Sequence, residues 1–326
     1  MKKFAMFILV FFIGSTLFLF GCKDKNLIRI NEVTHSIFYA PLYVAINNGY
    51  FDEYGYKIEL TNGGGSDASM TALLSGSADI ALMGPETGVY VNAGGKTDAP
   101  MIFGQLTKRD GSFLVGKIEE KDFKWSNLAG KHIIAGRKGG SPAMSLQYAL
   151  EKNGLNITTD LNFDLSVSFN NTVGAFTGGT ANYVTVFEPT ASDLVRNGKG
   201  FIVASVGKEA GEIPFTCFSA NKSFIQNNSK KIENFLKAIQ KAYNFIMTAN
   251  IDDVVESLKP SFSSSTDESI KSSIQSYKNI DAWCSSPVMT EQSYNRLLDM
   301  LIGAGEIQER VEMNKVVDNT IASKIV

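Results

Sequence analysis

The hydrophobic and polar positions of this 326-residue chain follow two alternating patterns. Short apolar runs rich in Ile, Val, Leu and Phe are typical of buried strands. They alternate with segments whose apolar residues recur with the period of a helix. We interpret the following runs as strands: Leu27–Val33, Lys57–Leu60, Asp79–Met83, Pro100–Leu106, Phe113–Val115, His132–Ala135 and Phe201–Ser205. This alternation predicts an α/β fold with mostly parallel sheets.

Two stretches of the chain repeat the same order of features. Met70–Asp79 aligns with Val173–Asn182, and each leads into a short strand, IALM in one case and YVTV in the other. A loop containing Pro and Glu follows each strand, as GPET and as FEPT. We interpret this similarity as a structural repeat of two α/β units. The alternative is chance similarity, because all βα units share such features.

The two units are predicted to form two lobes around a cleft. Ligands of open parallel sheets bind outside the carboxyl ends of the strands, so a cleft between facing lobes would lie there. The chain would cross at Thr107–Ser112 and return at Phe215–Asn221, forming a two-segment hinge. Lobe 1 would comprise residues 22–109 and 221–326, and lobe 2 residues 110–220. We expect the C-terminal helices, including the amphipathic segment Lys230–Thr248, to pack on lobe 1.

The N-terminus has the features of a secretory signal. Lys2 and Lys3 precede an uncharged apolar run that ends at small residues, which predicts a signal peptide over residues 1–21. The alternative is a short membrane anchor. Gly21 and Cys22 resemble the lipobox of bacterial lipoproteins. That resemblance implies an acylated Cys22 that anchors the mature protein outside the cell membrane.

Composition and motifs exclude several classes of function. The 31 Lys and Arg against 33 Asp and Glu leave no basic excess for nucleic acid. Three Cys and two His indicate neither a disulfide framework nor a zinc site, and we expect no metal and no cofactor. Phosphate-loop, dinucleotide-loop, GxSxG and HExxH motifs are missing from the sequence. Glu86 and Glu188 could form the acid pair of a secreted carboxylate-dependent hydrolase. However, we predict that the protein is not an enzyme.

Three segments together resemble a known family. They are THSIFYAPLYVAINNGYFDEYGYKIEL, GGGSDASMTALLSGSADIALMGPE and LAGKHIIAGRKGGSPAMSLQYALEKNGL. They resemble extracytoplasmic solute-binding proteins of ABC importers, in the branch that binds aliphatic sulfonates, taurine, nitrate and the thiamine pyrimidine precursor. The resemblance covers essentially all of the mature chain. It implies a type II periplasmic-binding-protein fold that closes on a small solute and delivers it to a permease and its ATPase, without catalysis. We also expect a monomer.

The loops at the expected strand ends supply the candidate ligand-binding residues. Two glycine loops, at Gly65 and Ser66 and at Gly140 and Ser141, offer bare backbone N–H groups. With Arg137 nearby, they would suit an anion such as a sulfonate, taurine or nitrate. Acidic and aromatic side chains in the same loops favour a heteroaromatic or zwitterionic solute, because a carboxylate can accept two hydrogen bonds from an aminopyrimidine edge. The expected ligand-binding residues are Thr34, His35, Tyr39, Gly65, Ser66, Asp67, Glu86, Arg137, Gly140, Ser141, Asn170, Phe187 and Glu188.

Glu188 is the residue that we expect most strongly to contact the solute, because it ends a predicted strand between Phe187 and Pro189. For two of the other candidates a structural role is the alternative. His35 could cap the first helix, and Asp67 could stabilise the first turn of its own helix through the helix dipole.

Overall fold

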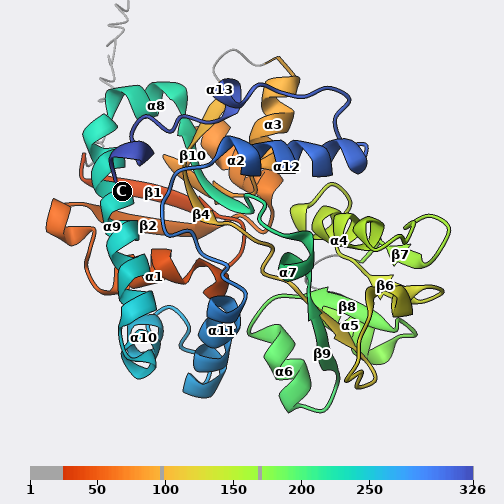
Figure 1. Ribbon diagram of the computed structural model, residues 1–326. Helices are drawn as coiled ribbons and strands as arrows, with labels where there is room; N and C mark the ends of the chain where they lie inside the picture. The colour runs from red at the N-terminus through yellow and green to blue at the C-terminus, as the bar shows by residue number, and fades with distance from the viewer. Residues whose placement is uncertain (1–24, 96–98, 168–170, 326) are drawn as a thin grey trace, which may run out of the picture.

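A computed structural model shows two α/β lobes joined side by side (Figure 1). The structure describes residues 25–95, 99–167 and 171–325. Cys22, the expected lipid attachment site, and the candidate ligand-binding residue Asn170 lie outside these ranges. Within the described ranges, no helix combines the length and the apolar character needed to cross a membrane.

Each lobe is built around a five-stranded sheet. In the first sheet the strand order is β2 (Lys57–Asn62), β1 (Leu27–Glu32), β3 (Ile80–Met83), β10 (Thr216–Asn221) and β4 (Pro100–Thr107). In the second sheet the order is β7 (Asn162–Asp164), β6 (His132–Ile134), β8 (Tyr183–Val186), β5 (Phe113–Gly116) and β9 (Phe201–Ser205). The runs that we interpreted as strands are therefore confirmed.

The two sheets have the same topology, and both are mixed. β1 pairs in parallel with β2 and β3, as β6 does with β7 and β8. β10 runs antiparallel to β3 and β4, and β5 runs antiparallel to β8 and β9. Four of the five strands in each sheet therefore run in one direction, as expected of mostly parallel sheets, and β5 and β10 are the exceptions. β5 and β10 each enter their lobe directly from a crossing between the lobes, so they run against their neighbours.

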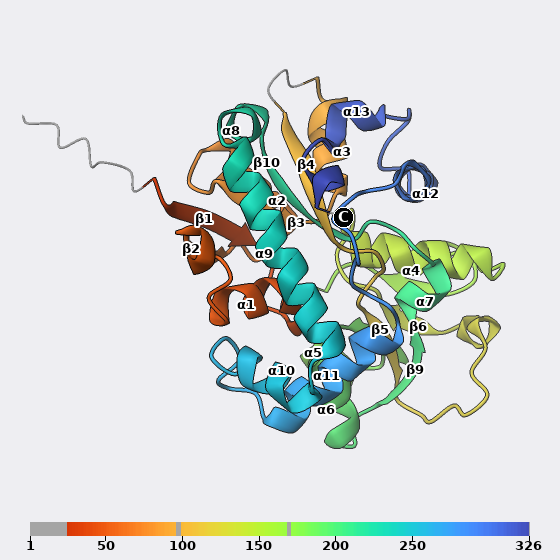
Figure 2. The ribbon, with the colours of Figure 1, turned by 60° about the vertical axis from the view of Figure 1, so that its left-hand side comes forward.

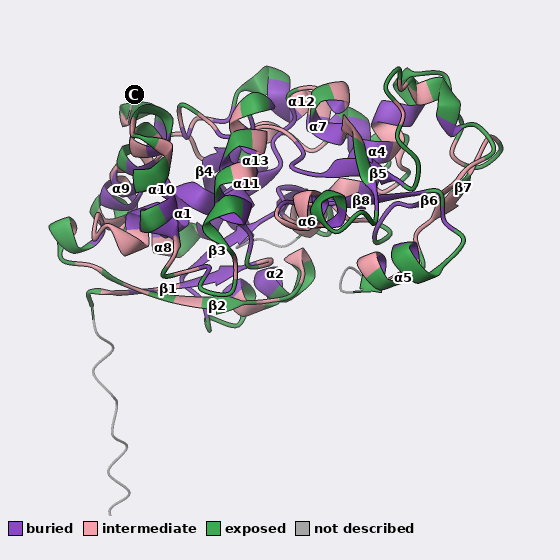
Figure 3. Ribbon diagram, turned by 90° about the horizontal axis from the view of Figure 1, so that it is seen from below, coloured by how far each residue is buried: buried purple, intermediate pink, exposed green. Residues whose placement is uncertain are grey.

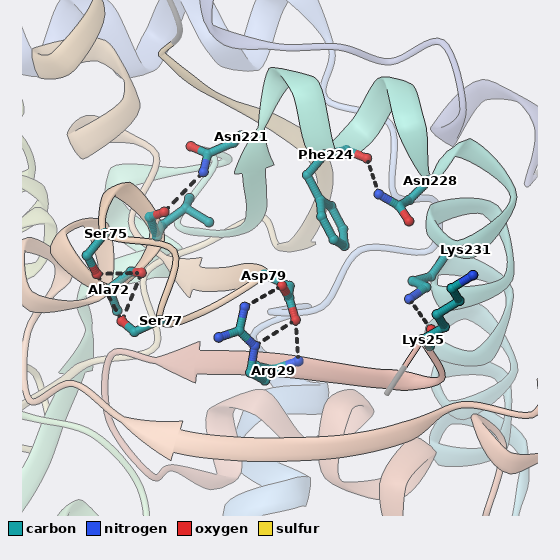
Figure 4. Close-up of polar contacts among 11 residues, drawn as sticks. Lys25, Arg29, Ala72, Ser75, Ser77, Asp79, Asn221, Phe224, Asn228 and Lys231 are labelled. Atoms are coloured by element: carbon teal, nitrogen blue, oxygen red, sulfur yellow. Dashed lines mark hydrogen bonds and ion pairs between the residues drawn. The ribbon is translucent and has the colours of Figure 1, made fainter. Parts of the chain in front are cut away.

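The predicted internal repeat is confirmed at the level of single hydrogen bonds. Asp79 precedes β3; its carboxylate accepts a bond of 3.0 Å from the backbone N–H of Arg29, and its own N–H donates to the Arg29 carbonyl at 2.8 Å. Asn182 precedes β8 and makes the same pair of contacts with His132, at 2.9 and 2.8 Å. In the first lobe the Arg29 guanidinium adds two bonds to the same carboxylate, at 3.1 and 2.7 Å (Figure 4).

The two crossings between the lobes run side by side. The first joins β4 to β5 within Thr107–Ser112, as predicted. β10, which we assigned to the return crossing, is instead a strand of the first sheet, so the return lies before it, at residues 206–215. The backbone N–H groups of Val206, Ile213 and Phe215 donate to the first crossing, at 2.9–3.1 Å. Lobe 2 therefore ends before residue 216 rather than at 220.

The first sheet lies between two layers of helices. On β3, the side chains of Ile80 and Leu82 join the cluster formed with helices α1 (Ala40–Asn47), α9 (Ser229–Thr248) and α10 (Ile251–Leu258). Ala81 and Met83 join the cluster on the opposite face with α2 (Ser66–Leu74). Figure 2 shows α9 running across its face of the sheet, and Figure 3 shows buried positions gathered on inner strands of both lobes, such as β3 and β8. The amphipathic helix predicted over Lys230–Thr248 is therefore confirmed as α9.

The C-terminal helices pack on the first lobe as expected, but they also touch the second. α11 (Asp267–Asn279) contacts α6 (Thr190–Arg196), and α12 (Glu291–Gly303) contacts α4 (Ser141–Lys152). These contacts place first-lobe helices on two sides of the second lobe. The remaining described helices are α3 (Glu86–Ala93), α5 (Thr172–Gly178), α7 (Val206–Ala210), α8 (Lys222–Asn227) and α13 (Met313–Val316).

Candidate functional site

A cavity of about 410 Å³ lies between the two lobes. Most of its wall comes from the loops that follow β1, β2 and β3 in the first sheet and β6 and β8 in the second, where ligands of open sheets bind. Thr172, Phe215 and Thr216 complete it. Its volume is in the range typical of small-molecule sites. The lining residues are Val33, Thr34, Ser36, Phe38, Tyr39, Asn62, Gly64, Gly65, Ser66, Gly84, Glu86, Ala135, Gly136, Arg137, Gly140, Ser141, Pro142, Thr172, Thr185, Phe187, Phe215 and Thr216.

The glycine loop after β2 reaches the cavity with its backbone. Gly64 has φ +75°, a left-handed conformation that favours glycine, and Gly65 and Ser66 line the cavity where α2 begins. A Cβ atom at Gly65 would lie 2.7 Å from Asp67 Oδ1 and 3.5 Å from the Arg137 guanidinium. The absence of a side chain therefore leaves room for an ion pair beside the cavity.

That ion pair joins the two lobes. Arg137, in the loop after β6, donates to Asp67 Oδ1 at 2.9 Å. The hydrogen bond from Arg137 is the main reason that the pKa of Asp67 is lowered. Both side chains are more than half exposed, so the pair contributes about 0–1 kcal/mol to holding the lobes together. Arg137 lines the cavity, whereas Asp67 lies outside it.

Glu86 is the only acidic residue in the described lining of the cavity. It begins α3, is 3% exposed, and accepts a hydrogen bond of 2.6 Å from Ser141 Oγ of the second lobe. Burial raises the pKa of the Glu86 carboxyl, although hydrogen bonds from Ser141, its own N–H and Ser66 act in the opposite direction. A Cβ atom at Gly84 would overlap this carboxylate, so glycine there leaves space for it.

Aromatic rings form another wall of the cavity. The ring centroids of Phe38, Phe187 and Phe215 lie 5.6, 5.8 and 6.2 Å apart in pairs, and Phe187 comes from the second lobe. Tyr39 lines the cavity beside them, and burial raises its pKa, so its hydroxyl stays protonated. Such a wall suits an apolar or planar part of a ligand.

Most of the expected ligand-binding residues therefore meet in one place. Those that line the cavity are Thr34, Tyr39, Gly65, Ser66, Glu86, Arg137, Gly140, Ser141 and Phe187. They come from loops far apart in the chain. This supports the prediction that the loops at the carboxyl ends of the strands converge.

His35 lies outside the cavity and has a structural role different from the helix cap that we considered. Its Nδ1 lies 2.9 Å from Glu32 Oε1, and its Nε2 lies 2.7 Å from the Ser261 carbonyl. Its ring stacks on Phe262 at 4.6 Å. The hydrogen bond to Glu32 is the main cause of a raised pKa, which favours the charged imidazolium. His35 therefore ties β1 to the loop between α10 and α11.

Glu188 is not among the lining residues either. Its carboxylate accepts hydrogen bonds from the backbone N–H and hydroxyl of Ser192 at 2.9 and 2.8 Å, and from Ser276 Oγ at 2.8 Å. Ser276 belongs to α11 of the first lobe. The residue that we expected to contact the solute is therefore turned towards a neighbouring helix.

Other lining residues were not predicted as contacts. Ser36 and Phe38 belong to a loop that we did assign to the cleft, so the position of that loop was the available signal. Thr216 lines the cavity because β10 starts there. We did not predict Thr216 as a contact because we had assigned β10 to the hinge.

Comparison with known proteins identifies a family match and a relative that covers nearly the whole chain. The NMT1-like family matches residues 34–259. The "Putative binding protein YtlA" of Bacillus subtilis (strain 168) is 37% identical over 319 residues, which is 96% of each chain.

Several solved structures share the fold at low sequence identity. The alkanesulfonate-binding protein SsuA of Xanthomonas axonopodis pv. citri bound to MOPS is 18% identical, with a TM-score of 0.72 over 90% of this chain and 98% of that one. The periplasmic nitrate-binding protein NrtA of Synechocystis PCC 6803 is 15% identical, with a TM-score of 0.69 over 93% and 88%. The Candida albicans CA3427 gene product, which exhibits the generic periplasmic binding protein fold, is 15% identical, with a TM-score of 0.67 over 90% and 96%. The predicted fold is therefore confirmed.

Proposed function

This chain belongs to the NMT1-like family, and we propose that it is the solute-binding protein of an ABC-type importer. The cavity between its two lobes is the observation that carries this proposal. Enclosure between two lobes lets a protein bury most of a small solute and release it when the lobes separate. We propose that the protein works as a monomer outside the cell, with Cys22 acylated as its membrane anchor, and delivers its solute to a permease and its ATPase.

For the solute we propose a small molecule with N–H donors on a planar or apolar body, such as a thiamine-pyrimidine precursor. The Glu86 carboxylate is buried in the cavity wall, and a buried carboxylate is stabilised by a donor or a cation. Phe38, Phe187 and Phe215 would pack against the body of the solute. Gly65 and Ser66, with Arg137, would bind an acceptor on the solute.

A small anion is the second candidate, because two of the structural neighbours are alkanesulfonate- and nitrate-binding proteins. The glycine loops and Arg137 favour it. Glu86 opposes it, since an ionised carboxylate would repel an oxyanion in a closed cavity. We propose no hydrolytic function. The second acid of the suspected pair, Glu188, is outside the lining and bound by serines.

The substitution Glu86→Gln should change the binding affinity in opposite directions for the two solute classes. We would screen the purified protein by thermal shift against aminopyrimidines and against sulfonates, taurine and nitrate. A bound solute at a hundredfold excess over its Kd adds about 2.7 kcal/mol of stability. For a donor-bearing solute, Glu86→Gln should weaken binding by about 1–3 kcal/mol. For an anion it should strengthen binding.

Glu59→Gln is the matched control, because Glu59 is an exposed acid on β2 and should leave either result unchanged. If no compound in either panel stabilises the protein, the proposed function is wrong for these solute classes. If Glu86→Gln binds a stabilising solute with unchanged affinity, Glu86 does not contact that solute.

A further inference from the structure

Helices α6 and α11 form a contact between the lobes beside the cavity (Figures 1 and 2). α6 belongs to the second lobe, because it follows β8. α11 belongs to the first lobe, because it packs against α10 and against the short 3₁₀ helix Ile37–Tyr39. The two helices therefore come from different lobes and are far apart in the sequence.

A buried carboxylate lies at the centre of this contact. Glu188 is 1% exposed, and its carboxylate is bound by Ser192 within its own lobe and by Ser276 Oγ of α11 at 2.8 Å. The backbone N–H of Glu188 donates to the hydroxyl of Tyr277, also on α11, at 3.0 Å. The Tyr277 hydroxyl also lies 3.5 Å from the Glu188 carbonyl oxygen, so the carboxylate, the N–H and the carbonyl of this single residue all contact the opposite lobe.

A second polar cluster extends the contact along α11. Arg196 Nη2, at the end of α6, donates to Ser269 Oγ at 3.0 Å, and that hydroxyl lies 3.4 Å from Asp193. Carboxylate, guanidinium and hydroxyl groups are all readily hydrated. Separation of the helices would therefore expose groups that water can satisfy, which is the behaviour expected of a reversible contact.

The contact shares its aromatic neighbours with the cavity. The ring of Tyr277 lies 5.0 Å from that of Phe38, and Phe38 lies 5.6 Å from Phe187, the residue before Glu188. Phe38 and Phe187 both line the cavity, from opposite lobes. A solute that packs against both rings would contact the same two elements that Glu188 and Tyr277 connect.

We propose that the α6–α11 contact is an interlobe latch, with Glu188 at its centre, that favours the closed arrangement of the lobes even without solute. This inference rests on the proposed function in one respect, because it takes lobe closure to be the step that retains the solute. In this role Glu188 acts on the solute indirectly, by positioning the lobe that carries Phe187.

The latch is tested by measuring the distance between the lobes without solute. Spin labels on non-natural residues at the exposed positions Lys57 and Lys199 would report the distance distribution by pulsed electron paramagnetic resonance. The wild-type protein should show a short-distance population. The double substitution Ser276→Ala and Tyr277→Phe removes every hydrogen bond described here between α11 and Glu188. It should lower the ratio of closed to open molecules about tenfold or more.

Ser272→Ala is the matched control. It removes the same group from the same helix, but its hydroxyl bonds the Ser269 carbonyl within α11 at 3.1 Å, so the distances should not change. Circular dichroism would verify that each variant folds. An unchanged distribution in the double variant would overturn the latch, as would a wild-type protein without a short-distance population. Failure of the proposed function would appear differently, as a protein that no solute stabilises.

Discussion

The contact between Asp79 and Arg29 allows a quantitative test of how each sheet is tied together. In Asp79→Ala the backbone N–H of Arg29 loses its 3.0 Å partner, which costs about 1–3 kcal/mol. The guanidinium loses two further bonds, and because its side chain is 21% exposed we assign about 1 kcal/mol to them. We therefore expect Asp79→Ala to lower the free energy of unfolding by about 2–4 kcal/mol.

Asp79→Asn should have a smaller effect, because Asn182 makes the equivalent backbone contact in the second lobe with an amide oxygen. We expect a loss of about 1 kcal/mol, the ionic part alone. The assay is urea unfolding followed by circular dichroism, with the midpoint and the m-value compared between variants. Asp67→Ala is the control. It breaks an Arg–Asp pair that is mostly exposed and should change stability by less than about 1 kcal/mol.

The reasoning would be refuted if Asp79→Asn destabilised the protein as much as Asp79→Ala. The ion pair would then carry the whole effect, and the backbone contact shared by the two lobes would contribute nothing. An Asn182→Ala variant as stable as the wild-type protein would likewise show that this backbone contact contributes nothing in the second lobe.

Three further predictions concern other parts of the chain. In Gly207→Ala the new Cβ atom would overlap the backbone carbonyl of Asp110, where the two crossings meet. Urea unfolding should therefore show a free energy of unfolding lower by about 1–3 kcal/mol. The control Gly174→Ala, at an open helical position, should be neutral or stabilising. Burial raises the pKa of Asp110 to about 7, above its unfolded value near 3.8, so the folded state binds more protons and wild-type stability should fall as pH rises from about 4 to 7. Asp110→Asn should reduce that fall, to which the raised pKa of the Glu86 carboxyl also contributes, and parallel pH profiles would contradict this expectation. Cys22→Ser should release the protein from membranes or leave its precursor uncleaved, and normal processing with full membrane retention would argue against lipid anchoring.

Local sequence patterns were sufficient to predict most elements and the general place of the cavity. Apolar runs of strand length are hard to accommodate elsewhere in an α/β chain, so the runs that we interpreted as strands are strands. The loops after them were placed correctly because parallel strands bring their carboxyl ends to one edge of a sheet. The similarity of Met70–Asp79 and Val173–Asn182 was sufficient to reveal the repeat, because both segments make the same turn before the same strand.

The tertiary structure decided which acid faces the cavity. Glu86 and Glu188 follow equivalent strands, but Glu86 comes after Pro85 and begins α3, whereas Glu188 comes before Pro189 and precedes α6. Only Glu86 lines the cavity. Glu188 is directed to α11, whose hydroxyl groups lie almost ninety residues away in the sequence. No local pattern records that partner.

The same limit explains β10 and the boundary of the second lobe. The residues of β10 could form either a crossing or a strand, and their pairing with β3 and β4 makes them a strand. Those partners are more than a hundred residues earlier in the chain. Sequence by itself determined which segments can be strands and where their loops lead, because these depend on short-range patterns of burial. Folding decided which long-range partners each segment meets, because hydrogen bonds between distant residues depend on how the whole chain packs.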